Sequence, residues 1–300
     1  MENFFLLGVC FGMGLIFRRL PQFPENTPKV LNGFILYISL PSLVLYHIHE
    51  LKFTNTALLP ASMPWFLFLI ATLFFLGLYK IEFLNFKTAV CLVLTAGLGN
   101  TSFVGFPILE TYFGKESLGY GIIADQLGTF LALSFPGIIL AATAESGNWN
   151  AKILFKRVIG FLPVYALVFA LMFRGVAYPE FLKIVLIRLG DTLTPLALVS
   201  VGFMLDIRTI GNFKKHLFVG LVFKLIISPI IVYYTYISLK NDPLLFKTIV
   251  MESAMAPMVT STIIAIEKNL NPHLASLMLG VGIPISFFST AVVFFILEGR

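Results

Sequence analysis

The stretch GLGNTSFVGFP, residues 97–107, interrupts a long apolar segment with glycines and an asparagine. A membrane-spanning helix normally satisfies every backbone N–H and C=O group internally, because lipid offers no hydrogen-bond partner. A break near the middle of the membrane therefore persists only where it is buried in protein or lines a wet cavity. We interpret residues 97–107 as the break in a discontinuous membrane helix, which is a common place for a binding site.

The composition extends this interpretation to the whole chain. Hydrophobic residues make up 58% of the 300 residues and charged residues only 12%, and the mean hydropathy is +0.93. A soluble domain carries about 25% charged residues. Several segments run for about 20 residues without a charge, which is long enough to cross a hydrocarbon core. The sequence thus predicts an all-α polytopic membrane protein.

Ten spans are predicted, joined by short connections. They cover residues 4–20, 29–49, 57–79, 88–112, 118–144, 153–173, 182–205, 216–239, 245–267 and 273–297. The N-terminal segment lacks the basic region and cleavage site of a secretory leader, so we expect it to be the first span. Cys10 and Cys91 both lie in apolar stretches, and we expect neither a disulfide nor a metal site.

The distribution of positive charge predicts the orientation. Twelve Lys and Arg residues lie in the connections on one side of this topology, against seven on the other. Positively charged loops stay in the cytoplasm, so both termini are predicted outside it, in a multi-pass protein of the cytoplasmic membrane. The net charge of +6 is explained by these loops, and no nucleic-acid partner is expected.

An internal repeat relates the two halves of the chain. The second and seventh spans contain LPSLVL at 40–45 and TPLALV at 194–199, while the fourth and ninth begin with FKTAV at 86–90 and FKTIV at 246–250. The ninth span also breaks, at Ala256 and Pro257. Two five-helix repeats, 1–147 and 148–300, fit this spacing. Because five is odd, the second must insert upside down, as in many secondary transporters.

The two breaks lie at a similar depth and are expected to cross. Asn100 is about 13 residues into its span, or roughly 20 Å at 1.5 Å per residue, and Pro257 is about as deep from the opposite face. There the half-helices that follow the breaks present N-terminal ends, whose free N–H groups and partial positive charge favour an anion. We expect Asn100 to act as a helix cap and Pro257 to occupy a first helical position.

The residues expected to contact the substrate surround both breaks, and the flexible positions lie among them. The substrate-binding candidates are Gly99, Asn100, Thr101, Ser102, Ala256, Pro257 and Met258, and the candidate hinges are Gly97, Gly99 and Pro257. A glycine or proline that only kinks a helix or lets helices pack closely is the structural alternative at each position.

Three charged residues within the predicted spans are candidates for ion coupling. Asp125 and Glu252 have no oppositely charged partner one turn away on their own helices, so we predict that they bind protons. Lys224 either reaches the membrane surface or supplies a counter-charge. No metal site and no cofactor are expected.

Four segments give the chain a resemblance to a known family. GLGNTSFVGFPIL at 97–109, LGDTLTPLALVSVGFML at 189–205, KLIISPI at 224–230 and MESAMAPMV at 251–259 are similar to the auxin efflux carrier family, whose prokaryotic members are described as malate or malonate permeases. The resemblance covers essentially the whole chain, and the order and spacing of the segments agree.

This resemblance implies a particular architecture and site. It implies crossed, broken helices 4 and 9 in a mobile transport domain of helices 3–5 and 8–10, a scaffold of helices 1, 2, 6 and 7, and elevator-type transport. In the plant PIN proteins an asparagine at the crossing meets the substrate carboxylate, and Asn100 occupies its place. The chain departs from them at Gly99, where the plant pattern has proline, and in its short connection at 145–152, which favours a prokaryotic metabolite carrier. A homodimer through the scaffold is expected from the resemblance alone.

The sequence therefore predicts a secondary transporter of small organic carboxylate anions, proton-coupled or uniporting. One alternative is a sodium-coupled symporter of the bile-acid-transporter type, and another is a membrane carboxylate sensor. An intramembrane aspartyl protease that uses Asp125 and Asp191 is a weaker alternative, because the residues around both aspartates depart from the protease motifs.

Overall fold

The structure is a computed structural model that describes residues 2–50, 58–146, 162–173, 176–205 and 210–299. Within these ranges the chain forms helices and turns and contains no β-strand. Six described helical stretches are long and apolar enough to cross a membrane: Thr27–Tyr46, Leu59–Lys80, Leu118–Glu145, Glu180–Met204, Ile210–Thr235 and Pro272–Glu298. The predicted all-helical membrane fold is confirmed, whereas the ten crossings and the inverted repeat stay predictions.

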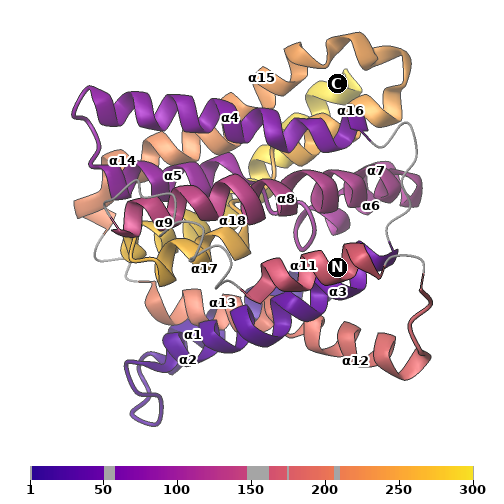
Figure 1. Cartoon of the computed structure of the whole chain (residues 1–300). Coiled ribbons are helices and arrows are strands. Elements are labelled where there is room, and N and C mark those ends of the chain that lie inside the picture. The colour runs from indigo at the N-terminus through magenta and orange to yellow at the C-terminus, as the bar shows by residue number, and fades with distance from the viewer. Residues whose placement is uncertain (1, 51–57, 147–161, 174–175, 206–209, 300) are drawn as a thin grey trace.

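The helices lie in two groups, one below the other in Figure 1. The smaller body contains α1 (Glu2–Phe17), α2 (Thr27–Phe34), η1 (Ile35–Ser39), α3 (Leu40–Glu50), α11 (Leu162–Met172), α12 (Glu180–Asp191) and α13 (Leu193–Met204). Its helices pack mainly on one another, with α13 against α1 and α2, and α3 against α11 and α12. Residues 153–161 of the predicted sixth span lie outside the described residues.

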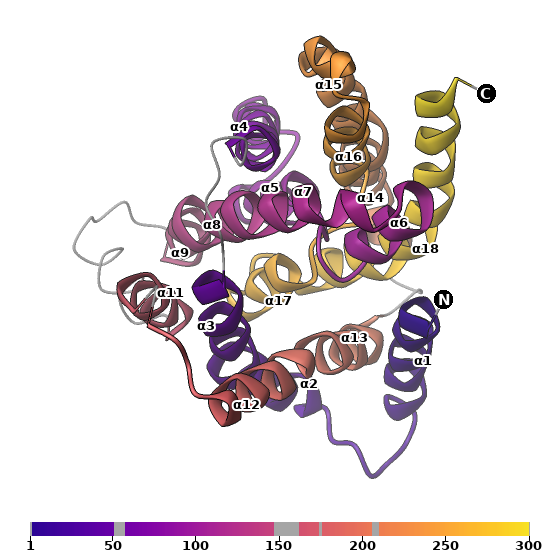
Figure 2. The same ribbon diagram turned by 90° about the vertical axis from the view of Figure 1, so that its right-hand side faces the viewer.

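The larger body holds the remaining helices of the described ranges. They are α4 (Leu58–Lys80), α5 (Phe86–Gly97), α6 (Gly105–Phe113), η3 (Lys115–Ser117), α7 (Leu118–Ile123), η4 (Ala124–Thr129), α8 (Phe130–Ala132), η5 (Leu133–Gly137), α9 (Ile138–Ser146), α14 (Ile210–Val222), η7 (Phe223–Ile227), α15 (Ser228–Thr235), η8 (Ile237–Asn241), α16 (Pro243–Ser253), α17 (Val259–Glu267) and α18 (Pro272–Glu298). In Figure 2, α17 of this body lies on the side that faces the smaller body, and both α17 and α18 pack against α13.

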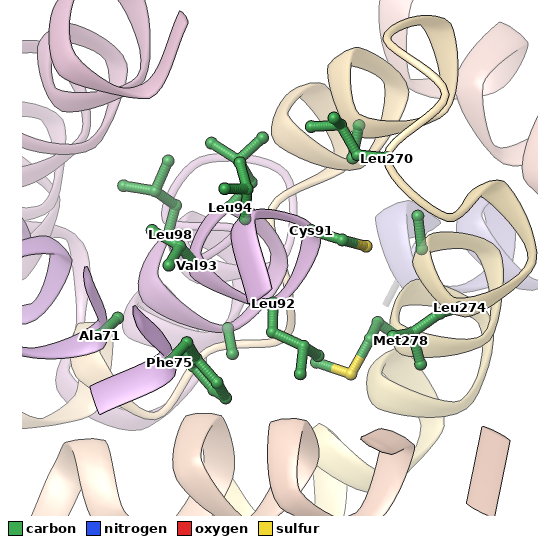
Figure 3. Packing of buried hydrophobic residues seen from close by; sticks show 14 of the residues in the cluster. Ala71, Phe75, Cys91, Leu92, Val93, Leu94, Leu98, Leu270, Leu274 and Met278 are labelled. Atoms are coloured by element: carbon green, nitrogen blue, oxygen red, sulfur yellow. The ribbon is translucent and has the colours of Figure 1, made fainter. Parts of the chain in front are cut away.

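The broken helices begin at side-chain caps and form the centre of the larger body. The Asn85 side chain accepts a hydrogen bond from the Thr88 N–H at the start of α5, and Asp242 accepts one from the Leu245 N–H at the start of α16. Every residue of α5 from Thr88 to Gly97 is buried. Figure 3 shows why: α5 side chains meet Ala71 and Phe75 of α4 on one side and Leu270, Leu274 and Met278 on the other. A helix apolar on all faces belongs at such a centre.

Glycines allow the closest helix contacts in the smaller body. Gly14 of α1 and Gly202 of α13 lie so close that a Cβ atom at either would meet the backbone of the other helix. Small residues at such a contact are typical of membrane helices, because the backbones can then approach and gain van der Waals energy.

Candidate functional site

The two helix breaks cross and are joined by backbone hydrogen bonds. The Asn100 N–H donates to the Ala256 carbonyl at 2.8 Å, and the Met258 N–H donates to the Leu98 carbonyl at 3.1 Å. Gly99 and Pro257 thus face each other in an antiparallel bridge. The bridge satisfies backbone groups that neither broken helix could satisfy alone, which makes an interruption at this buried position stable.

Asn100 caps the turn that leads into α6 and not, as we expected, the helix itself, because the N-cap residue of α6 is Val104, which makes no side-chain cap hydrogen bond. The Oδ1 atom of Asn100 accepts hydrogen bonds from the Phe103 and Val104 N–H groups, at 3.1 and 3.3 Å. The residue is 2% exposed, and its Nδ2 atom has no hydrogen-bond partner among the described residues. A buried amide donor without a partner costs about 1–3 kcal/mol, so Asn100 has a strong tendency to bind an acceptor.

The second break leaves a helix N-terminus without a side-chain cap. We expected Pro257 at a first helical position, and this was wrong: α17 begins at Val259, with Met258 as its N-cap residue. Pro257 lies earlier, in the bridge, because the Met258 N–H is used across the crossing. Met258 provides no side-chain cap, and the first residues of α17 are buried. An uncapped helix N-terminus attracts negative charge through its free N–H groups.

Thr101 connects the crossing to Asp125. Its hydroxyl donates to Asp125 Oδ1 at 2.6 Å, and Gln126 Nε2 donates to Asp125 Oδ2 at 2.8 Å. The Thr129 hydroxyl lies 3.2 Å from that of Thr101. All four side chains are buried, whereas Ser102 is only partly buried. The structure therefore brings Asn100, Thr101 and Asp125 into one polar site.

Lys224 places its ammonium group at the crossing instead of reaching the membrane surface. It is 1% exposed, and its Nζ atom donates to the Ser253 carbonyl at 3.2 Å. Ser253 ends α16, where unpaired carbonyls carry a partial negative charge. A Cβ atom on Gly99 would stand 3.0 Å from this Nζ, so the glycine allows the ammonium to approach.

Glu252 is buried beside the same crossing. It is 1% exposed, and neither of its carboxyl oxygens has a hydrogen-bond partner among the described residues. The carboxyl group lies against two glycines: added Cβ atoms would stand 2.8 Å from its Oε2 at Gly105 and 3.1 Å from its Oε1 at Gly121. Asp125 and Lys224 are the charged groups that act on it.

Gly97, a predicted hinge, is the last residue of α5 and lies against α4. A Cβ atom there would stand 2.8 Å from the Cβ of Ala71. Close helix packing is enough to explain this glycine, and its role as a hinge stays a prediction.

Several site residues were missed in the sequence. Thr129 could have been found from its spacing, because a residue four positions after Asp125 lies on the same helix face, whereas Gln126, one position after it, gave no such signal. Gly105 and Gly121 gave no local signal, since the carboxyl group that needs their space comes from a distant helix.

Two other kinds of site find no support in the described part of the chain. No group of three His, Cys, Asp or Glu residues there could hold a metal ion. Asp191 is exposed at the end of α12 in the smaller body, whereas Asp125 is buried in η4 of the larger body. The pair of aspartates that an intramembrane protease needs is therefore not assembled.

A cavity of about 580 Å³, lined by both apolar and polar side chains, lies between the two bodies. Arg18, Lys29 and Asn32 line it from the smaller body, and Glu267 and His273 line it from the larger body. At its wall the Asn32 Nδ2 donates to Glu267 Oε1 at 3.1 Å, and the Ser200 hydroxyl donates to Asn32 Oδ1 at 2.6 Å. The first of these hydrogen bonds connects the bodies at the C-terminal end of α17, and the second joins Asn32 to α13 within the smaller body.

Comparisons with known proteins agree with this architecture. A family described as membrane transport protein matches residues 5–294. An uncharacterized transporter of Methanothermobacter thermautotrophicus is 26% identical over 268 residues, which cover 88% of this chain and 87% of the relative. An uncharacterized transporter of Methanocaldococcus jannaschii is 27% identical over 267 residues, covering 82% and 83%. The chain therefore belongs to the membrane transport protein family of the auxin efflux carriers, and it is a multi-pass membrane transporter and not an enzyme.

Proposed function

We propose that the protein is a secondary transporter of small organic carboxylate anions, which bind at the crossing of the two broken helices. The observation that carries this proposal is the buried Nδ2 atom of Asn100, a hydrogen-bond donor that has no partner in the part of the chain that the structure describes. It belongs to the same crossing as the uncapped N-terminus of α17 and the ammonium group of Lys224. Donors and positive charge that gather around an unfilled position suit a carboxylate.

Movement of the larger body against the smaller one would carry the substrate across the membrane. The smaller body corresponds to the scaffold implied by the family resemblance, and the larger body to the transport domain, in two inverted repeats at 1–147 and 148–300. The crossing is occluded in this structure, since Asn100 and Thr101 are each 2% exposed. The cavity between the bodies provides an approach from the side that carries the α1–α2 connection. We place that side in the cytoplasm, with both termini on the other face of the cytoplasmic membrane.

Uptake by proteoliposomes tests the assignment of Asn100. We expect labelled acetate, malonate or malate to enter vesicles that contain the wild type. Loss of a hydrogen bond to a charged group costs about 1.5–3 kcal/mol, so Asn100→Ala should reduce uptake roughly 10- to 100-fold. Asn100→Asp keeps an oxygen for the cap but replaces the donor with a negative charge, and it should abolish uptake.

Asn26→Ala is the matched control, because Asn26 is exposed and makes no side-chain cap hydrogen bond. Undiminished uptake by Asn100→Ala would refute the role of this residue. Binding of these anions without any flux would indicate a sensor, and flux that requires sodium but ignores a pH gradient would indicate a sodium symporter.

A further inference from the structure

Three buried ionisable groups from three different elements surround the crossing. They are Asp125 on η4, Lys224 on η7 and Glu252 on α16, and each is 5% exposed or less. Two carboxylates and one ammonium group sum to a net charge of −1, whereas a single added proton makes the cluster neutral. A net charge buried in a membrane protein is costly, so the further negative charge of a bound carboxylate favours the uptake of one proton by this cluster.

The hydrogen bonds show which group carries this proton. The Asp125 carboxylate accepts from Thr101 and Gln126, and the Lys224 ammonium donates to the Ser253 carbonyl. These contacts hold both groups in their charged forms. Glu252 differs, because both of its oxygens are buried without a partner.

Among the residues whose exposure is described, the other charged side chains on elements packed against α16 are exposed. They are Lys80 on α4, Glu110 on α6, Glu116 on η3, Lys240 on η8 and Glu298 on α18. Asp125 and Lys224 are therefore the charged groups at the Glu252 carboxyl. The carboxyl group of Glu252 lies in the space between Gly105 of α6 and Gly121 of α7, and α6 is the helix that follows the break at residues 97–107.

We propose that Glu252 is the proton-coupling residue of the transporter, with Lys224 as a built-in cation that makes a sodium ion unnecessary at the crossing. The proposal rests on the transport function proposed above. One proton passes from the aqueous phase to a Glu252 oxygen when the crossing opens to that phase, and it leaves to the other phase after the larger body has moved. Only this O–H bond forms and breaks. The carboxylate substrate and the proton cross together and the empty carrier returns with Glu252 deprotonated, so each cycle moves one proton with one substrate, which is electroneutral for a monocarboxylate.

Two transport assays on the same vesicles separate this proposal from the transport function. Exchange of labelled for unlabelled acetate, malonate or malate at equal pH on both sides needs the substrate site but no net proton movement. Accumulation driven by a pH gradient needs both. We expect the wild type to perform both reactions without sodium. Glu252→Gln, which mimics the protonated side chain, should retain exchange and lose gradient-driven accumulation.

Glu298→Gln is the matched control, because Glu298 is an exposed partner of Lys247 at the end of α18; it should retain both reactions. Gradient-driven accumulation by Glu252→Gln, or wild-type exchange without any response to the gradient, would overturn the proposal and leave the transport function standing. Absence of wild-type exchange would instead sink the transport function.

A chemical measurement on the unmutated protein covers the case in which Glu252→Gln does not fold. A hydrophobic carbodiimide reacts with protonated carboxyl groups in apolar surroundings. Mass spectrometry of the labelled wild type should find the adduct on Glu252, with less labelling as the pH rises. Labelling of Asp125 alone would overturn the assignment.

Discussion

At the scale of single residues, Lys224 shows how a buried charge is made tolerable. Its Nζ atom reaches the Ser253 carbonyl at the C-terminal end of α16, where the helix dipole is negative. The same ammonium group lies across the crossing from the N-terminal end of α17, so the site has a fixed cation beside an uncapped helix start. Both features suit the anionic substrate that we propose.

Lys224→Met tests this charge, because methionine is similar in length but neutral. Truncating one partner of a buried charge pair typically costs 2–5 kcal/mol, so we expect the KM for a carboxylate substrate to rise by at least about tenfold. Initial-rate uptake measurements would show this. Lys247→Met, which removes a partly exposed ion pair, should leave the KM unchanged. An unaltered KM in Lys224→Met would mean that the ammonium group does not contribute to substrate affinity.

At the scale of elements, α18 supports the crossing by close contact. A Cβ atom on Gly282 would stand 2.6 Å from Cδ of Pro257. The proline ring cannot turn away, because it belongs to the backbone that bridges the two breaks. The position of the second break is thus fixed by packing against α18 as well as by hydrogen bonds.

Gly282→Ala should therefore destabilise the protein even though alanine favours a helix. Overpacking of a well-packed core costs typically 1–3 kcal/mol, and we expect a lower melting temperature in detergent together with slower uptake. Gly77→Ala on α4 is the control, because no atom lies within 4 Å of an added Cβ there; it should leave the melting temperature unchanged or raise it. A melting temperature for Gly282→Ala at or above that of the wild type would contradict the expected clash.

Element boundaries were the part of the fold that could be predicted well. Apolar length and short polar connections indicated most of the helical ranges, although α14 begins at Ile210 and not at the predicted residue 216. The break at 97–107 was expected because glycines interrupt an apolar run. The backbone bridge between the two breaks could not be predicted, and neither could the direction in which the Lys224 side chain points. Both depend on which distant segments of the chain meet. In helices that are apolar on all faces, periodicity does not show which side faces a neighbour.

At the scale of the whole molecule, the proposed mechanism requires the two bodies to move, and the hydrogen bond from Asn32 to Glu267 joins them in one arrangement. Asn32 belongs to the smaller body and Glu267 to the larger one. In a background with Cys10 and Cys91 replaced by alanine, the double variant Asn32→Cys, Glu267→Cys should lose uptake when a short bis-maleimide joins the thiols. A monofunctional maleimide should inhibit it less.

The double variant Ser39→Cys, Thr192→Cys is the control for this experiment. These two hydroxyls lie 2.7 Å apart, and both residues belong to the smaller body. Joining them should leave uptake intact, because that body is expected to stay rigid. Full uptake by the cross-linked Asn32 and Glu267 variant would show that transport does not need the bodies to separate at this contact.

The bridge between the two breaks has a consequence for how such a carrier can evolve. The bonds between residues 98–100 and 256–258 use backbone atoms only, so the frame of the crossing does not depend on the side chains at Leu98, Ala256 or Met258. Changes at these positions and at Thr101 can alter the shape and polarity offered to a substrate while the frame persists. The substrate preference of such a carrier can therefore change through the side chains at the crossing while the backbone arrangement of the crossing is kept.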